Sequence, residues 1–329
     1  MGEAFLNFEQ AVNLIEEELK AVEAEMARNL FSEIVMIPTV TTYLISGGGK
    51  RFRPVLLLIC AHLCGYHGPR AVPLASTIEF IHTATLLHDD VVDRAFVRRG
   101  LASANSVWGD GASVLVGDFL FTKSFSIIVQ DGNLHILEVV SGATTRMAEG
   151  EVMQLVKMGK PEITEEDYYY VVMNKTAVLI SAACKIGAIL GSVSREKEKA
   201  LADFGFNLGI AFQLMDDTLD YVSEEVTFGK AIGKDLDEGK ITLPLIHTLR
   251  TCSTAERERL TQIILDPNGR RADLGYLLKL VQDCGGITYT TQRAEEFVAK
   301  AQSYLSLFPP SKEKEALLAI SDYTIRRKW

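Results

Sequence analysis

The sequence predicts an all-α protein built as one large helical bundle. The 329 residues include only nine prolines, which leave two proline-free spans, 74–160 and 162–243, where helices can run unbroken. Strand signals are weak, because no hairpin dipeptide separates alternating apolar and polar runs. Hydrophobic residues make up 47% of the chain, enough for a large core, and no linker or whole-domain repeat marks a boundary. We therefore expect a single domain over residues 1–329.

The N-terminal segment carries the apolar stripe of an amphipathic helix. The stripe residues recur at steps of four and three and are Phe8, Val12, Ile15, Leu19, Val22 and Met26. Later helix starts are indicated by residues that cap free backbone amides, namely Thr164 with Asp167, Ser194, and Ser253 with Glu256. The segment Tyr168–Met173 is rich in β-forming residues. It follows the cap at Thr164, so we assign it to a helix.

Composition and charge argue against several classes of protein. The formal charge of −9 and the pI near 5.3 come with no basic stripe for nucleic acid. The apolar segments 55–64 and 177–190 are broken by His62 and Lys185, short of the ~18 uncharged residues of a membrane span. The N-terminus lacks the pattern of a signal peptide, and five thinly spread cysteines suit reduced thiols rather than disulfides or zinc. We expect a cytoplasmic protein.

Two short acidic clusters occur inside apolar helical segments. The pattern Asp-Asp-x-x-Asp is formed by Asp89, Asp90 and Asp93 and again by Asp216, Asp217 and Asp220. On a helix the i and i+4 carboxylates lie one turn apart, ~5–6 Å along the axis. Carboxylates this close repel unless a cation neutralises them, and oxygen ligands favour Mg²⁺. Because Mg²⁺ keeps coordination positions for substrate phosphate, the two clusters indicate a catalytic site for a phosphorylated ligand.

Basic residues near the clusters suit such a ligand. They are Lys50, Arg51, Arg53, Arg98, Arg99, Lys175, Lys230, Lys234 and Lys240. Guanidinium and ammonium groups are the usual partners of phosphate, so several of them indicate a ligand with two phosphates. A nucleotide-binding P-loop is excluded at Gly47–Lys50, because the first glycine of that motif is absent and Arg51 replaces its Ser or Thr.

With these motifs in this order, the sequence resembles the trans (all-E) isoprenyl diphosphate synthases over nearly its whole length. The resemblance rests on GGKRFRP at 48–54, IEFIHTATLLHDDVVD at 78–93, RRG at 98–100, SVLVGDF at 113–119, NKTA at 174–177, FQLMDDTLDY at 212–221 and GKDLDEGKITLPL at 233–245. It implies an all-helical fold with a central cavity, the Asp-rich segments facing each other across its mouth, usually in a homodimer. The implied reaction joins isopentenyl diphosphate to the cation formed when an allylic diphosphate ionises.

The resemblance also implies roles for individual residues. Three Mg²⁺ ions would be held by Asp89, Asp90, Asp93, Asp216, Asp217 and Asp220. The allylic diphosphate would contact Arg98, Lys175, Thr176, Gln213, Lys230 and Lys240. Isopentenyl diphosphate would lie on Lys50, Arg53, His82 and Arg99. The residues expected to act in catalysis are Asp89, Asp90, Asp93, Lys175, Asp216 and Lys230.

Product length in this family depends on the residues four and five positions before the first Asp-rich motif. Here these are Thr85 and Ala84, both small, so the resemblance implies a long product. The residues expected to line the tunnel for the growing chain are Ile81, Ala84, Thr85, Phe121, Phe125 and Ile128. The stretch 78–121 most resembles octaprenyl diphosphate synthases, the makers of quinone side chains. Hexa-, hepta-, nona- and decaprenyl products are the alternatives.

Two other functions are weighed against this interpretation. A class I terpene cyclase would share the first motif and Mg²⁺, but DDTLD at 216–220 differs from the second metal motif of cyclases. A non-catalytic accessory subunit of a two-chain prenyl synthase would typically have lost the Asp-rich motifs, which are intact here. A transient contact with a membrane surface would help to release a long apolar product, although no strongly basic amphipathic helix supports it.

Overall fold

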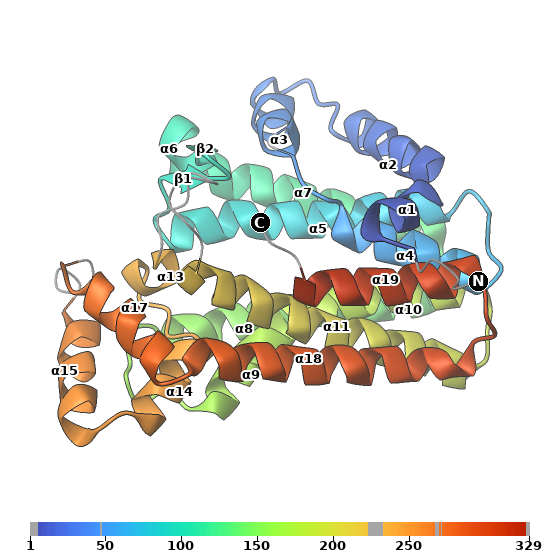
Figure 1. Ribbon diagram of the computed structural model, residues 1–329. Helices are drawn as coiled ribbons and strands as arrows, with labels where there is room; N and C mark the ends of the chain where they lie inside the picture. Colours follow the sequence, from blue (N-terminus) through green and yellow to red (C-terminus); the bar gives the residue numbers. More distant parts are fainter. Residues whose placement is uncertain (1–5, 47, 223–232, 267–269, 271, 327–329) are drawn as a thin grey trace. The chain divides into compact units, whose positions relative to one another are not determined.

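A computed structural model gives the structure of the chain and describes residues 6–46, 48–222, 233–266, 270 and 272–326. Helices make up nearly all of the regular structure in these ranges (Figure 1), so the all-α prediction is confirmed. The chain divides into two compact units. The first comprises residues 1–142, 179–205 and 304–320, and the second comprises residues 143–178, 206–303 and 321–329. Each unit is described by itself.

The first unit contains the N-terminal elements and parts of three later helices. Its elements are α1 (Phe8–Asn13), α2 (Glu16–Asn29), α3 (Met36–Ser46), α4 (Phe52–Leu63), α5 (Ala71–Val92), β1 (Val97–Arg98), β2 (Leu101–Ala102), α6 (Ala104–Trp108), α7 (Asp110–Asp131), the start of α8 (Leu134–Lys157), most of α10 (Val178–Leu190), the start of α11 (Arg195–Val222), η2 (Leu305–Leu307) and most of α19 (Lys312–Arg326).

Helix α5 is the centre of the first unit. It packs against α7, α4 and α2, and Ile78, Ile81, Ala84 and Leu87 on it are fully buried. Burial of apolar side chains on several sides of one helix fixes its rotation about its axis. The first Asp-rich motif lies at the C-terminal end of this helix, so the core of the unit sets the direction in which each aspartate points.

A short hairpin in the first unit, with two residues in each strand, was not predicted. Strands β1 and β2 pair antiparallel, with Val97 opposite Ala102 and Arg98 opposite Leu101. Both turn residues, Arg99 (φ 51°) and Gly100 (φ 77°), have positive φ, as a tight hairpin turn requires. Strands this short leave no alternation in the sequence, and an arginine in the left-handed region is not a common turn signal. The weak strand signals of the sequence therefore did not reveal this hairpin.

The second unit collects the middle and C-terminal helices. Its elements are the rest of α8, α9 (Glu165–Val172), the π-helix η1 (Met173–Ala177), the rest of α11, α13 (Lys234–Asp237), α14 (Leu243–Thr251), α15 (Thr254–Leu265), α17 (Leu274–Asp283), α18 (Gly286–Tyr304) and the end of α19. Its core joins Ile210 and Leu214 of α11 to Val172 of α9, Leu245 of α14 and Val281 of α17.

The predicted helix starts are confirmed, with one difference at the N-terminus. Thr164 and Ser253 form reciprocal capping boxes with Asp167 and Glu256. The N-terminal stripe does not lie on one helix, because Ile15 leaves the helical conformation (φ −129°, ψ 22°) between α1 and α2 while its side chain is fully buried. A break of two residues keeps the apolar spacing nearly intact, so the pattern alone did not reveal it.

Two helical segments, Asp110–Asp131 and Glu165–Leu190, are long and apolar enough to cross a membrane by length and composition. In the second of them, 72% of the most apolar window is buried inside the structure, as in the core helix of a soluble protein. In α7 the share is only 39%. Helix α7 therefore carries the larger exposed apolar face.

Candidate active site

The three aspartates of the first Asp-rich motif differ in burial and in partners. Asp90 is fully buried and pairs with Arg98, whose Nε lies 2.8 and 2.9 Å from the two carboxylate oxygens and whose terminal nitrogen lies 2.8 Å from one of them. Asp89 and Asp93 are half-buried and lie one helical turn apart at the end of α5. Charge-assisted bidentate pairing of this kind is strong and directional. Asp90 therefore anchors the hairpin to α5.

Arg98 and Arg99 are placed by the hairpin next to a second basic segment. A Cβ on Gly49 would lie 3.0 Å from an Arg99 nitrogen and 3.1 Å from an Arg51 nitrogen, so both guanidinium groups pass close to this glycine (φ +152°). Lys50 is exposed beside it, and Arg53 is half-buried in the first turn of α4. The structure thus brings Arg99 to the GGKRFRP segment, as the predicted isopentenyl diphosphate site requires.

One buried and one partly exposed carboxylate hold this cationic group in place. Arg51 contacts Glu23 of α2 and Glu79 of α5 and donates to the Ile45 carbonyl at 3.2 Å. Glu79 is only 5% exposed. Burial raises the pKa of Glu79, whereas Arg53 and Arg51 lower it. Arg51 was predicted only as one of the basic residues near the acidic clusters, with no role of its own. Glu79 was not predicted, although a glutamate inside an apolar run was a usable signal.

His82 lies one turn beyond Glu79 on α5 and shares its cationic surroundings. Burial lowers the pKa of His82 well below its usual value, and the charges of Arg53 and Arg99 lower it further. The imidazole is therefore uncharged at neutral pH, and it can meet an anionic ligand only through a neutral N–H.

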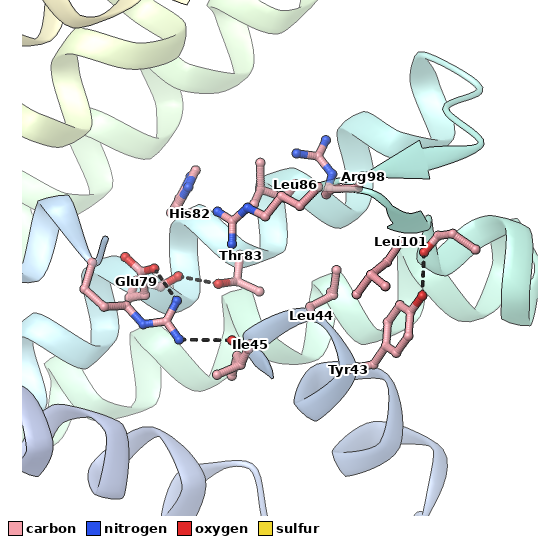
Figure 2. A pocket seen from close by; sticks show the side chains of 12 residues that line it. Tyr43, Leu44, Ile45, Glu79, His82, Thr83, Leu86, Arg98 and Leu101 are labelled. Atoms are coloured by element: carbon pink, nitrogen blue, oxygen red, sulfur yellow. Dashed lines mark hydrogen bonds and ion pairs between the residues drawn. The ribbon is translucent and has the colours of Figure 1, made fainter. Parts of the chain in front are cut away.

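A small cavity of about 30 Å³ lies between α3, α5 and the hairpin. Figure 2 shows Tyr43, Leu44 and Ile45 of α3 on one side of it and Glu79, Thr83 and Leu86 of α5 on the other. The Tyr43 hydroxyl donates to the Ala102 carbonyl at 2.8 Å. This volume has room for water. His82, Arg98 and Arg99, which were predicted to contact the substrates, also line the cavity, so it adjoins the predicted substrate residues.

In the second Asp-rich motif, on α11, the middle residue Asp217 is also buried and hydrogen-bonded to protein side chains. Asp217 is 4% exposed and accepts hydrogen bonds from the Tyr168 hydroxyl at 2.5 Å and from the Gln213 amide at 2.7 Å. Burial and the nearby Asp235 raise the pKa of Asp217, whereas these two hydrogen bonds lower it. Asp220 accepts the Asp235 backbone N–H at 3.1 Å, at the start of α13. Asp216 and Asp220 lie one turn apart on the helix.

The NKTA segment forms the π-helix η1 between α9 and α10. π-Helical turns are rare and often occur at functional sites. Lys175 pairs with Glu151 of α8 at 2.5 Å, and Thr176 donates to Gln213 at 2.8 Å. Gly150 of α8 packs so closely on this segment that a Cβ there would lie 2.7 Å from the backbone nitrogen of Lys175. The structure therefore connects Thr176 and Gln213 directly, as the predicted diphosphate site requires.

The last predicted diphosphate residues follow α11. Lys240 pairs with Glu238 at 2.7 Å, and Glu238 also pairs with Lys234 at 3.2 Å. Lys240 therefore has a defined position after α13. Lys230 lies outside the described residues.

The carboxylates fit Mg²⁺ by the chemistry of their donor atoms. Across the described ranges, no three His, Cys, Asp or Glu side chains gather closely enough to hold a metal by themselves. Mg²⁺ takes one or two carboxylates and completes its shell with water and substrate phosphate. Pairs of aspartates one turn apart, such as Asp89 with Asp93 and Asp216 with Asp220, meet that requirement.

The predicted tunnel residues differ in their surroundings. Ile81, Ala84 and Ile128 are buried, and Thr85 is half-buried with its hydroxyl donating to the His82 carbonyl at 2.7 Å. Phe121 and Phe125 lie with ring centroids 5.4 Å apart and line an open groove on α7 together with Thr122, Ser126 and Val129. The two phenylalanines therefore lie at the edge of the first unit rather than in its core.

Comparison with known proteins gives consistent matches. The family model described as polyprenyl synthetase matches residues 35–281. Octaprenyl diphosphate synthase of Escherichia coli is 42% identical over 322 residues, covering 98% of this chain and 99% of that protein. A nonaprenyl diphosphate synthase of Rhodobacter capsulatus is 36% identical, with 95% and 96% covered.

Solved structures agree with these matches. A decaprenyl diphosphate synthase from Rhodobacter capsulatus superposes with a TM-score of 0.92 at 39% identity, covering 97% of this chain and 98% of that one. A polyprenyl synthase from Caulobacter crescentus, complexed with calcium and isoprenyl diphosphate, gives 0.93 at 37% identity, with 99% of both chains covered. Each of these four matches covers at least 95% of this chain.

Proposed function

We propose, from the premise that this chain belongs to the polyprenyl synthetase family, that it builds an all-trans octaprenyl diphosphate for the side chain of a quinone. As a member of that family the chain is a prenyltransferase. The proposed substrates are isopentenyl diphosphate and an allylic diphosphate such as farnesyl diphosphate. The octaprenyl length is supported by the E. coli relative, while the nonaprenyl and decaprenyl relatives keep the neighbouring lengths as alternatives.

One observation carries this proposal. In each unit a pair of aspartates one turn apart stands near cations that buried or half-buried carboxylates hold in place. Arg98 is held by Asp90, and Lys175 is held by Glu151. Cations with fixed positions bind a diphosphate without first losing side-chain freedom, which favours stabilisation of the charge that develops as the diphosphate departs.

The chemistry follows from these groups. Bound Mg²⁺, three ions by the family's pattern, supplies positive charge that stabilises the departing diphosphate. Arg98, Lys175, Thr176, Gln213, Lys230 and Lys240 hold the allylic diphosphate, and Lys50, Arg53, His82 and Arg99 hold isopentenyl diphosphate. The allylic C–O bond breaks and its electron pair leaves with the diphosphate. The isopentenyl double bond then attacks the allylic carbon, and the released diphosphate takes the proton that is lost.

We assign different tasks to the aspartates of each motif. Asp89 and Asp93 at the end of α5, and Asp216 and Asp220 on α11, are the proposed metal ligands. Asp90 and Asp217 support them, because both carboxylates are buried against protein donors. The growing chain would pass Ile81, Ala84 and Thr85 in the direction of Phe121, Phe125 and Ile128.

The assembly and location are also proposed. Leu115 (69% exposed) and Val129 (64%) leave an apolar face on α7, which supports a homodimer through this helix, tested by sedimentation equilibrium. Phe31, Ile34 and Val35, between α2 and α3, are exposed and support a transient membrane contact during product release, tested by co-sedimentation with liposomes. The five cysteines are free thiols, in keeping with the reducing cytoplasm.

Product analysis tests the function. The purified chain is incubated with Mg²⁺, farnesyl diphosphate and labelled isopentenyl diphosphate, and the dephosphorylated products are sized by chromatography. We expect a C40 alcohol that depends on Mg²⁺. A shorter product would refute the octaprenyl assignment. No elongation beside an active control enzyme would favour the accessory-subunit alternative.

A further inference from the structure

Tyr168 on α9 belongs to none of the predicted sites, yet its hydroxyl is hydrogen-bonded to the second Asp-rich motif. The side chain is 5% exposed, and the hydroxyl donates to Asp217 at 2.5 Å. The other Asp217 oxygen accepts from Gln213 at 2.7 Å, and the Gln213 carbonyl accepts from Thr176 at 2.8 Å. Four side chains from α9, α11 and η1 thus form one continuous chain of hydrogen bonds.

All hydrogen bonds of this chain run in one direction. The Tyr168 hydroxyl donates to one oxygen of Asp217, and the Gln213 NH₂ group donates to the other. With its NH₂ group facing Asp217, Gln213 must present its carbonyl to Thr176, whose hydroxyl then donates. The second N–H of Gln213 is left to donate in another direction. Asp217 therefore fixes the orientation of the Gln213 amide.

We propose that Tyr168 is the positioning residue of the second Asp-rich motif, acting through Asp217 to hold the Gln213 amide with its second N–H available to the allylic diphosphate and to set the turn of α11 that carries Asp216 and Asp220. This inference rests on the proposed function. Without the Tyr168 hydroxyl, Asp217 keeps one hydrogen bond and is free to rotate about its side-chain bonds. Rotation removes the constraint on Gln213 and changes the position of the carboxylates next to it on the helix.

A structural role for the tyrosine ring must be separated from this role of its hydroxyl. Tyr168 also belongs to the apolar core of the second unit, with Val172, Ile210 and Leu214. Tyr168→Phe keeps the ring and removes only the hydroxyl. Tyr221→Phe is the matched control, because Tyr221 is 7% exposed in the same unit and its hydroxyl bonds Thr242 at 2.9 Å, outside the chain of hydrogen bonds.

The test measures metal binding and kinetics on the full chain. Mn²⁺ binding in the presence of inorganic pyrophosphate is followed by electron paramagnetic resonance for the wild type, Tyr168→Phe and Tyr221→Phe. We expect Tyr168→Phe to weaken Mn²⁺ binding and to raise KM for farnesyl diphosphate about tenfold, the effect of one hydrogen bond to a charged group. KM for isopentenyl diphosphate and the properties of Tyr221→Phe should stay within about twofold of wild type.

A double-mutant cycle decides whether Tyr168 acts through Asp217. Asp217→Asn replaces one of the two accepting oxygens with an NH₂ group, so it breaks the donor order at either Gln213 or Tyr168. It should therefore show the same selective loss even if Tyr168→Phe is unstable. Tyr168→Phe should add less than twofold to Asp217→Asn. Full additivity, or Tyr168→Phe behaving like Tyr221→Phe, would overturn the inference. If the wild type binds Mn²⁺ and pyrophosphate but elongates nothing, the proposed function fails while the binding data still decide the role of Tyr168.

Discussion

Gly150 and Gly142 lie on the same helix, α8, in opposite surroundings, so one substitution at the two positions tests the importance of η1. A Cβ at Gly150 would lie 2.7 Å from the backbone nitrogen of Lys175 and 3.0 Å from two carbon atoms of Asn174. A Cβ at Gly142 would meet nothing within 4 Å. Alanine therefore presses on the π-helix at the first position and extends into open space at the second.

The expected sizes of the two effects follow from these distances. Ordinary van der Waals contact begins near 3.4 Å, so Gly150→Ala must push the Lys175 backbone away by about 0.7 Å. Overpacking of this kind costs about 1–3 kcal/mol, and the better helix propensity of alanine offsets about 0.5–1 kcal/mol of it. Because a misplacement of ~1 Å can cost ~100-fold in rate, we expect kcat to fall at least ~10-fold. Gly142→Ala should instead gain about 0.5–1 kcal/mol.

Urea unfolding and steady-state kinetics of the two variants check this pair of expectations. Gly150→Ala should lose far more activity than its loss of stability explains, since the protein remains folded at assay temperature. Gly142→Ala should keep wild-type kcat and unfold at higher urea. Equal activity in the two variants would refute the idea that close packing of α8 on η1 sets the position of Lys175.

Three further expectations concern the first unit. Ala84→Phe should shorten the product to C15–C20 with elongation retained, as sized by chromatography, because position 84 is fully buried on α5; an unchanged C40 product would contradict the proposed tunnel. Burial and nearby arginines lower the pKa of His82 in the folded chain. Near pH 6.5 the unfolded chain therefore takes up a proton that the folded chain does not, so the free energy of unfolding decreases as pH falls below about 6.5. His82→Gln should flatten that part of the urea-unfolding profile between pH 7.5 and 5.5, and an unaltered slope would argue against it. Arg98→Met should cost about 3–5 kcal/mol of stability by leaving the Asp90 charge buried, whereas a loss below ~1 kcal/mol would show that Asp90 does not depend on Arg98.

The features of the fold that the sequence predicted correctly are those decided by residues close together in the chain. The capping boxes at Thr164 and Ser253 are decided by residues three positions apart, so they could be found without knowing the tertiary structure. The turn at Arg99 and the break at Ile15 could not, because the ion pair beside the first and the burial of the second exist only in the folded unit. Arg98, next to Arg99, is held by Asp90 eight residues earlier, and Ile15 is fully buried.

The candidate site was predictable in its charged residues and not in the residues that hold them. Aspartates and lysines in motifs are visible in the sequence because the chemistry requires those residue types. Glu151 and Tyr168 are ordinary helix residues until the fold brings them to Lys175 and Asp217. The π-helical turn at 173–177 was also missed, since one extra residue per turn hardly alters an apolar pattern.

The two Asp-rich motifs follow one geometric rule. An α-helix advances about 100° per residue, so the first and last aspartates of Asp-Asp-x-x-Asp share a face, while the second points about a quarter-turn away. In both motifs that second aspartate, Asp90 or Asp217, is buried and bound by protein donors. A run of three metal ligands would leave the helix end without such a link to the protein. The second aspartate instead ties each motif to an arginine or a tyrosine, which gives a physical reason for an adjacent pair of aspartates rather than two aspartates four residues apart.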